Sequence, residues 1–283
     1  MKKLALVFGV VLLGSVVIGN FTNSYATYFG SITIPDTLVS GSPESWYNRT
    51  SSGTNPGGED NEIEPGCLTG QGWDLEGFFV DTTINKFVIV GGYDFKNGNQ
   101  GYASGDIFVG NDPKYGATVP SLPSGDPNHQ NDPISNLFGY KWAIHLNFNT
   151  STGGTYDLYG LDNSTLLEVW YNQNYQANPW RYSKDATETH INYGTFTFLS
   201  GLTDAQVGFD GDGSNTHYAI EIPLSGLPVS GDWYFHYTYQ CGNDFLMGHG
   251  NLPTPPVPEP ATMFLLGSGL VGLAGFARKK FRK

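Results

Sequence analysis

The chain has 283 residues and a formal net charge of −12, with only 14% charged residues against 14% aromatic residues. So many aromatic residues and so few charges exclude an intrinsically disordered chain. They also argue against a coiled coil or helical bundle, which would be rich in Ala, Glu, Lys and Leu. The acidic balance argues against nucleic acid as a partner, because phosphates require a basic surface. The length allows one large domain or two small ones.

Residues 1–26 have the three parts of a secretory signal peptide. Lys2 and Lys3 form a basic start, Leu4 to Ile18 is an apolar run, and small residues precede the expected cleavage after Ala26. The apolar run is shorter than the ~20 residues that cross a membrane. We therefore expect a cleaved signal peptide, with an uncleaved N-terminal anchor as the alternative.

The C-terminus joins a Pro-Glu-Pro motif to a short apolar helix and a basic end. The motif is Val257, Pro258, Glu259 and Pro260, and the 17 residues 261–277 that follow are at the lower limit for spanning a bilayer. A basic stop would keep the end of the chain cytoplasmic. It consists of Arg278, Lys279, Lys280, Arg282 and Lys283.

Residues 257–283 closely resemble the PEP-CTERM sorting signal of Gram-negative bacteria. The resemblance implies recognition by exosortase, a membrane cysteine transpeptidase whose substrate would be residues 258–260. It implies transient anchoring in the inner membrane before transfer to the cell surface or the extracellular matrix. Such proteins often accompany exopolysaccharide production, so exopolysaccharide is an expected partner.

Between the two ends lies a core of residues 27–256. Seven of the 14 basic residues and one of the 26 acidic residues lie in the ends, which leaves the core with a net charge of −18. Seventeen of its acidic residues are Asp, which favours turns and oxygen ligation of cations. A solvated acidic surface accounts for most of them.

The core consists of short β-branched and aromatic runs bounded by turn residues, without a sustained helical period. About eleven such strands favour an all-β fold, a β-sandwich of jelly-roll type, with a closed barrel as the alternative. Residues 40–66 and 112–136 have the composition of long loops, and 249–256 that of a Pro-rich linker. The predicted strands are 28–34, 75–81, 86–91, 106–110, 140–148, 155–159, 166–171, 195–199, 206–210, 217–222 and 233–240.

Several segments of the core resemble known groups. Residues 72–77, 90–95, 104–108 and 239–244 resemble exosortase-dependent surface proteins, which implies a surface role without known catalysis. Residues 105–108 and 218–224 more weakly resemble carbohydrate-binding and DOMON-like β-sandwiches. The latter resemblance implies sugar recognition only by fold, and fold does not determine function.

Cys67 and Cys241 both belong to the exported core. Two cysteines in an oxidising compartment predict one disulfide, which would close a long loop. Two separate thiols are the alternative.

Two places are candidates for calcium. Asp210 and Asp212 alternate with glycines, so their oxygens could turn toward one cation, although an Asp-Gly hairpin turn is favoured. Asp106 and Asp112 flank a strand and could also contribute ligands, with turn-forming strand ends as the alternative.

Aromatic residues in a polar, Asn- and Gln-rich stretch form a candidate carbohydrate-binding surface, because a flat ring can stack on the apolar face of a sugar. Packing at the edge of the sheet is the alternative. The residues are Trp170, Tyr171, Tyr175, Trp180 and Tyr182.

Evidence for an enzyme is thin, since the chain has no nucleophile elbow, zinc-protease motif, P-loop or Rossmann fingerprint. Glu76, Glu168 and Glu221 could in principle supply a glycosidase carboxylate pair. We therefore expect a non-enzymatic exported protein with a structural or adhesive role at the surface, associated with exopolysaccharide. A lectin-like module, with or without calcium, is the first alternative, and a glycan hydrolase the second.

Overall fold

The computed structural model describes residues 28–34, 67–112, 133–170, 177–183, 189–209, 216–227 and 230–253. These residues form an all-β fold with one nine-stranded sheet, in the order β1-β2-β10-β9-β6-β5-β3-β11-β12, and one three-stranded sheet, β4-β7-β8. The strands are β1 (Leu75–Asp81), β2 (Lys86–Gly91), β3 (Ile107–Gly110), β4 (Pro133–Ser135), β5 (Trp142–Thr150), β6 (Gly153–Gly160), β7 (Leu166–Glu168), β8 (Arg181–Tyr182), β9 (Thr189–Leu202), β10 (His217–Pro223), β11 (Gly231–Thr238) and β12 (Phe245–Leu252).

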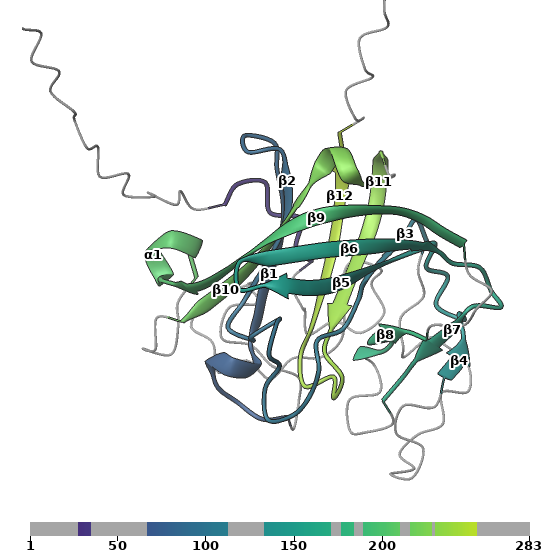
Figure 1. The fold of residues 1–283 in the computed structure, drawn as a ribbon, viewed down its shortest axis with the longest axis horizontal. Helices are drawn as coiled ribbons and strands as arrows, with labels where there is room; N and C mark the ends of the chain where they lie inside the picture. Colours follow the sequence, from purple (N-terminus) through teal and green to yellow (C-terminus); the bar gives the residue numbers. More distant parts are fainter. Residues whose placement is uncertain are drawn as a thin grey trace, which may run out of the picture.

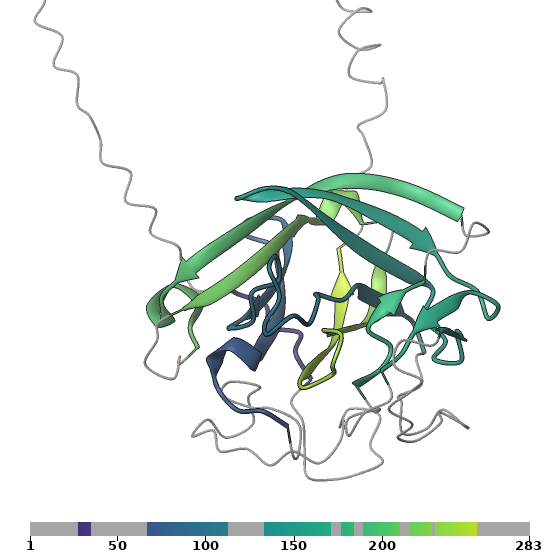
Figure 2. The same ribbon diagram turned by 60° about the horizontal axis from the view of Figure 1, so that its bottom comes forward.

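The nine-stranded sheet curls over on itself. In Figures 1 and 2 the teal and green strands β5, β6, β9 and β10 arch over the blue and yellow strands β1, β2, β11 and β12. The two edge strands, β1 and β12, come to lie side by side. The two packed layers that the sequence predicted are therefore parts of a single, nearly closed sheet.

An N-terminal segment completes the closure. Residues 28–34 form bridges on one side to β1, between Ser31 and Phe79, and on the other to β12, between Thr33 and Gly248. The strand predicted over residues 28–34 is thus present as two single bridges. An edge strand with unpaired backbone groups invites aggregation, and this segment covers two such edges at once.

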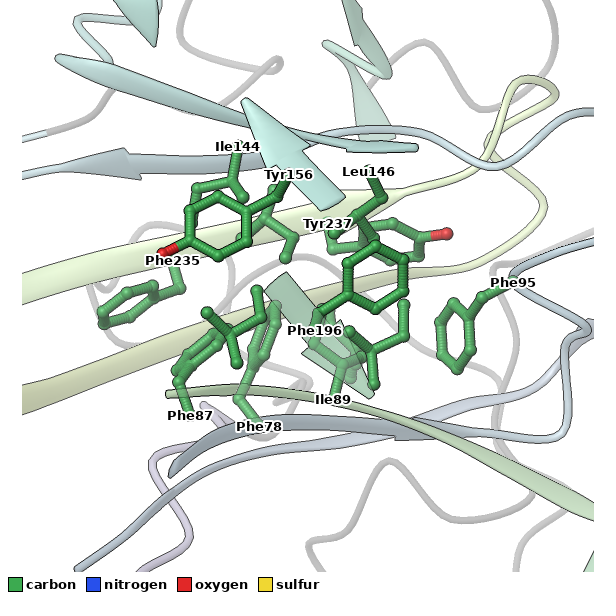
Figure 3. Packing of buried hydrophobic residues seen from close by; sticks show 14 of the residues in the cluster. Phe78, Phe87, Ile89, Phe95, Ile144, Leu146, Tyr156, Phe196, Phe235 and Tyr237 are labelled. Carbon is green, nitrogen blue, oxygen red and sulfur yellow. The ribbon is translucent and has the colours of Figure 1, made fainter. Parts of the chain in front are cut away.

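The interior of the curled sheet is filled by side chains rather than by a channel. Figure 3 shows side chains of both layers in this core, among them Tyr156 of β6 and Phe196 of β9 from one layer and Phe78 of β1 from the other. Phe87 of β2 lies with its ring centroid 5.5 Å from Phe78 of β1 and 4.9 Å from Phe235 of β11. Each buried ring of this kind stabilises the fold by roughly 1.5–3 kcal/mol.

Strands β1 and β2 are buried on both faces, which explains their continuous apolar sequences. Their inner side chains enter the main core, while Phe79, Val88 and Val90 pack outward in a second cluster. That cluster is covered by Tyr28 and by the short helix α1 (Asp204–Val207), which contributes Val207.

The three-stranded sheet packs outside β3 and β5. Its Leu167 and Tyr182 share a buried cluster with Phe108 of β3 and Ala143 of β5. This packing determines where β8 lies against the larger sheet, and β8 supports the site described below.

Two predictions about local structure are wrong. In the described part of the strand predicted over residues 206–210, helix α1 extends to Val207 instead, because the Thr203 N–H donates to Gln206 Oε1 at 2.8 Å and Gly208 ends the helix at φ 88°. The linker predicted over residues 249–256 starts later than expected, because β12 continues to Leu252, which is buried.

Other predictions lie outside the described residues. These are the signal peptide 1–26, the loop 40–66, most of the loop 112–136 and the tail 257–283. In the described ranges, no helix has the length and apolar character needed to cross a membrane.

Candidate functional site

The outer face of β5, β6 and β9 carries a group of polar and aromatic side chains, which we call the β5–β6–β9 face. The inward residues of β5 and β6, such as Ile144 and Leu158, belong to the main core. Because side chains alternate along a strand, their neighbours point outward. These outward residues are His145, Asn147, Asp157, Tyr159 and, from β9, His190.

Asp157 is the centre of the face. Its carboxylate lies between the Nε2 atom of His190, at 3.0 Å from Oδ1, and the Nδ2 atom of Asn147, which donates to Oδ2 at 2.8 Å. His145 lies directly opposite Asp157 in the β5–β6 register. The side chains remain accessible, with exposed fractions of 19% for His145, 28% for Asp157 and 46% for His190.

A β-bulge brings His190 to this position. Leu158 pairs with Asn192 but the next residue, Tyr159, pairs with His190, so β9 has one extra residue at this point. Bulges of this kind change the direction of a side chain. As a result the His190 ring lies 5.6 Å from the Tyr159 ring and within reach of Asp157.

Two residues behind the face hold it in place. Asp106 is buried, and its Oδ1 lies 2.7 Å from His145 Nδ1 while its Oδ2 accepts from the Tyr182 N–H at 2.8 Å. The Tyr182 ring in turn stacks on Tyr159 at 4.6 Å. Asp106 therefore joins β8 to the larger sheet and orients His145, while Tyr182 supports Tyr159.

The chemistry of this face suits a polar ligand that also has an apolar side. Asn147, Asp157 and the two histidines offer hydrogen-bond donors and acceptors, and Tyr159 offers a ring fixed by stacking. Sugars combine hydroxyl groups with an apolar ring face in this way. In the described part of the chain, no three His, Cys, Asp or Glu side chains are arranged to hold a metal ion.

The aromatic residues predicted to bind carbohydrate are placed differently. Trp170, Trp180 and Tyr182 have exposed fractions of 7%, 2% and 2%, so they are buried in the fold. Tyr171 and Tyr175 lie outside the described residues. The buried ring of Tyr182 nevertheless reaches the candidate face through Tyr159.

Of the calcium candidates, Asp106 is buried with both carboxylate oxygens engaged, and Asp112 is exposed. Asp106 is thus inside the fold, whereas Asp112 is at its surface. Asp210 and Asp212 lie outside the described residues, and calcium binding there stays a prediction.

The three glutamates considered for catalysis each have a protein partner. Glu221 pairs with Lys86 and accepts from Tyr28 Oη at 2.8 Å, and Glu168 pairs with Arg181 at 2.9 Å. Glu76 is buried beside His217.

His217 is held between two carboxylates inside the fold. Its Nδ1 atom lies 2.6 Å from Glu76 Oε1, and its Nε2 atom lies 3.0 Å from Asp204 Oδ1 on α1. Burial alone lowers the pKa of His217, but the hydrogen bonds and charges of Glu76 and Asp204 outweigh it and raise the pKa above 6.5. The His217 imidazole therefore links β1, β10 and α1.

The structure records no bond between Cys67 and Cys241, so the predicted disulfide has no support from it and stays a prediction. Hydrogen bonds join the two segments instead. The Leu68 N–H donates to Asn243 Oδ1 at 2.7 Å, and Asn243 Nδ2 donates to Leu68 O at 2.8 Å. Burial also raises the pKa of the Cys241 thiol to about 11, which keeps it protonated and unreactive at neutral pH.

The sequence interpretation missed the members of the β5–β6–β9 face. The alternation in residues 142–148 already placed His145 and Asn147 on the side opposite Ile144 and Leu146. No comparable signal pointed to His190, because its position depends on the bulge in β9.

Comparison with known proteins identifies the sorting signal of the chain. Residues 256–280 match the PEP-CTERM protein-sorting motif. The match includes the predicted Val257, Pro258, Glu259 and Pro260, and three of the basic residues that follow. No curated protein and no solved structure matches the chain, so the resemblances stated for its core have no support from them.

The PEP-CTERM motif indicates an exported protein that exosortase sorts and processes at the cell envelope, after anchoring in the membrane by its C-terminus. The folded core is therefore the part of the chain that this machinery delivers.

Proposed function

We propose that the protein is a non-enzymatic component of the cell surface or extracellular matrix, with a structural or adhesive role in association with exopolysaccharide. The observation that supports this proposal is the β5–β6–β9 face, where Tyr159, His190 and Asp157 form an accessible group on the sheet. The PEP-CTERM resemblance implies an association with exopolysaccharide, and the face combines polar groups with an aromatic ring, so a glycan is the ligand that we propose for it.

The charge of the core narrows the kind of glycan. Residues 27–256 carry a net charge of −18, which repels polyanions. A neutral or amino-bearing polysaccharide therefore fits better than an acidic one. Each of the three glutamates considered for catalysis pairs with a different side chain, which supports a binding role rather than glycan hydrolysis. The pairs are Glu76 with His217, Glu168 with Arg181 and Glu221 with Lys86.

A binding experiment on the full chain tests the proposal. Exopolysaccharide from the producing cells is immobilised, and retention of the wild-type chain is compared with that of Tyr159→Ala. We expect the substitution to weaken retention about tenfold, because it removes a ring contact and the support for His190.

The chain offers a matched control on another surface. Tyr234 of β11 stacks on His249 of β12 at 4.1 Å, and His249 lies 3.0 Å from Asp232, so the same three residue types recur there. Tyr234→Ala should leave retention unchanged. Absence of binding by the wild type would overturn the proposal, and equal losses in both variants would contradict the location of the site.

A further inference from the structure

A slot for one extended peptide strand lies between β1 and β12. The Ile32 N–H donates to Phe78 O of β1 at 2.9 Å, and on the other side the His249 N–H of β12 donates to Ile32 O at 2.7 Å. Further bonds join Val80 to Gly30 at 2.9 Å and Ile34 to Met247 at 2.8 Å. We call the space between β1 and β12 the strand slot, and residues 28–34 the inserted segment.

Glycines in β12 shape the strand slot for Ile32. A Cβ atom on Gly250 would collide with the Cγ2 atom of Ile32, and one on Gly248 would lie 3.3 Å from the Ile32 carbonyl oxygen. Ile32 itself packs against the main core. A side chain at position 250 would therefore force Ile32 to move out of its place in the strand slot.

The start of the inserted segment is also anchored. Tyr28 is buried, and its hydroxyl donates to Glu221 Oε1 at 2.8 Å. The Phe29 N–H donates to Asp81 Oδ2 at 3.0 Å, while the Phe29 side chain is 59% exposed. The slot thus recognises backbone and side chains over the length of the segment, as in β-strand addition.

The chain does not require that slot and segment come from the same copy. Residues 35–66 separate the inserted segment from Cys67, and 32 residues can span at most about 110 Å. Cleavage of the signal peptide predicted over residues 1–26 would leave the segment at the new N-terminus. It would then be connected to the rest of the fold at one end alone.

We propose that the strand slot also takes residues 28–34 of a second copy of this chain, so that exported copies join by strand exchange. The same contacts form within a chain and between chains, so the balance depends on effective concentration. A connection of 32 residues keeps its two ends at an effective concentration on the order of millimolar. Anchoring of several copies in one membrane by their C-termini would raise the concentration at which one copy meets the segment of another. This inference does not depend on the proposed glycan binding.

Two defective full-length variants provide the first test. Ile32→Gln prevents the inserted segment from binding but keeps the strand slot intact. Gly250→Val blocks the strand slot but keeps the inserted segment intact. Coexpressed with different tags and purified in detergent, the two should form a 1:1 dimer that neither forms alone. Phe29→Gln in place of Ile32→Gln is the control, since it keeps its own segment in its own slot and should not increase association.

The wild-type chain provides a second test that needs no variant to fold. Two tagged wild-type copies should co-isolate from the same membranes, and a synthetic peptide of residues 28–34 should separate them. The same peptide with Ile32→Gln should be at least about tenfold less effective, because it loses the burial of one Ile side chain. Separate monomers in the variant pair, or wild-type association that the peptide leaves intact, would overturn the proposal.

Discussion

His236 of β11 provides a prediction whose size follows from its surroundings. The side chain is fully buried among aromatic rings, with Tyr140 at 5.8 Å and Phe108 at 6.2 Å. Its Nε2 atom donates to Pro179 O at 2.9 Å. Burial outweighs the hydrogen bonds to backbone carbonyls and lowers the pKa of His236 to about 4.

A lowered histidine pKa makes the fold less stable in acid. Between pH 6.5 and about 4 the unfolded chain binds a proton at this residue that the folded chain does not bind. Stability therefore falls as the pH drops through this window, and this contribution levels off below the folded pKa. The shift from 6.5 to about 4 corresponds to about 3 kcal/mol in the free energy of unfolding.

The perturbation is His236→Gln, which retains a donor near Pro179 but does not titrate. Equilibrium urea unfolding of the full chain at pH 7 and pH 4 gives the difference in stability between wild type and variant. We expect the free energy of unfolding of the variant, relative to that of the wild type, to be about 3 kcal/mol higher at pH 4 than at pH 7. Phe29→Gln, at an exposed position without a titrating group, is the control and should move it by no more than about 0.5 kcal/mol. A difference for His236→Gln that does not change with pH would refute the reasoning.

Two further predictions concern the same fold. Above pH 6.5 the wild type should lose stability as the pH rises through the raised pKa of His217, and His217→Gln should lack this decline. Equal declines in the urea midpoints of wild type and variant would contradict the interactions of His217 with Glu76 and Asp204. Phe235→Ala should reduce the free energy of unfolding by about 3–5 kcal/mol because it leaves a cavity among buried rings, whereas Phe29→Ala should change it by about 0.5 kcal/mol or less. Similar melting temperatures for these two variants would contradict the packing shown in Figure 3.

The strands buried on both faces were predictable from the sequence. The bounds of β1 and β2 match the predicted ranges 75–81 and 86–91, because their apolar runs are continuous and end at turn residues. In β12, by contrast, Gly248, His249 and Gly250 interrupt the apolar run. Those glycines make room for Ile32, so the reason for the strand's composition lies in a segment more than 200 residues earlier.

The candidate site was only partly within reach of sequence reasoning. The period of two in β5 placed His145 and Asn147 together, but the pairing of β6 with β9 and its bulge brought in Asp157 and His190. The disulfide was inferred from the compartment alone and has no support from the structure, where the Asn243 amide makes the contact between the two segments. Register and long-range hydrogen bonds of this kind leave no local signal in a single sequence.

The most direct test of the central claim is the location of the chain with and without its sorting tail. Cells producing the full chain, or the chain lacking residues 257–283, are fractionated into membrane, surface with exopolysaccharide, and medium. We predict that the full chain is recovered with the surface and its exopolysaccharide, and that the truncated chain is no longer retained there. The same distribution for both chains would contradict the account.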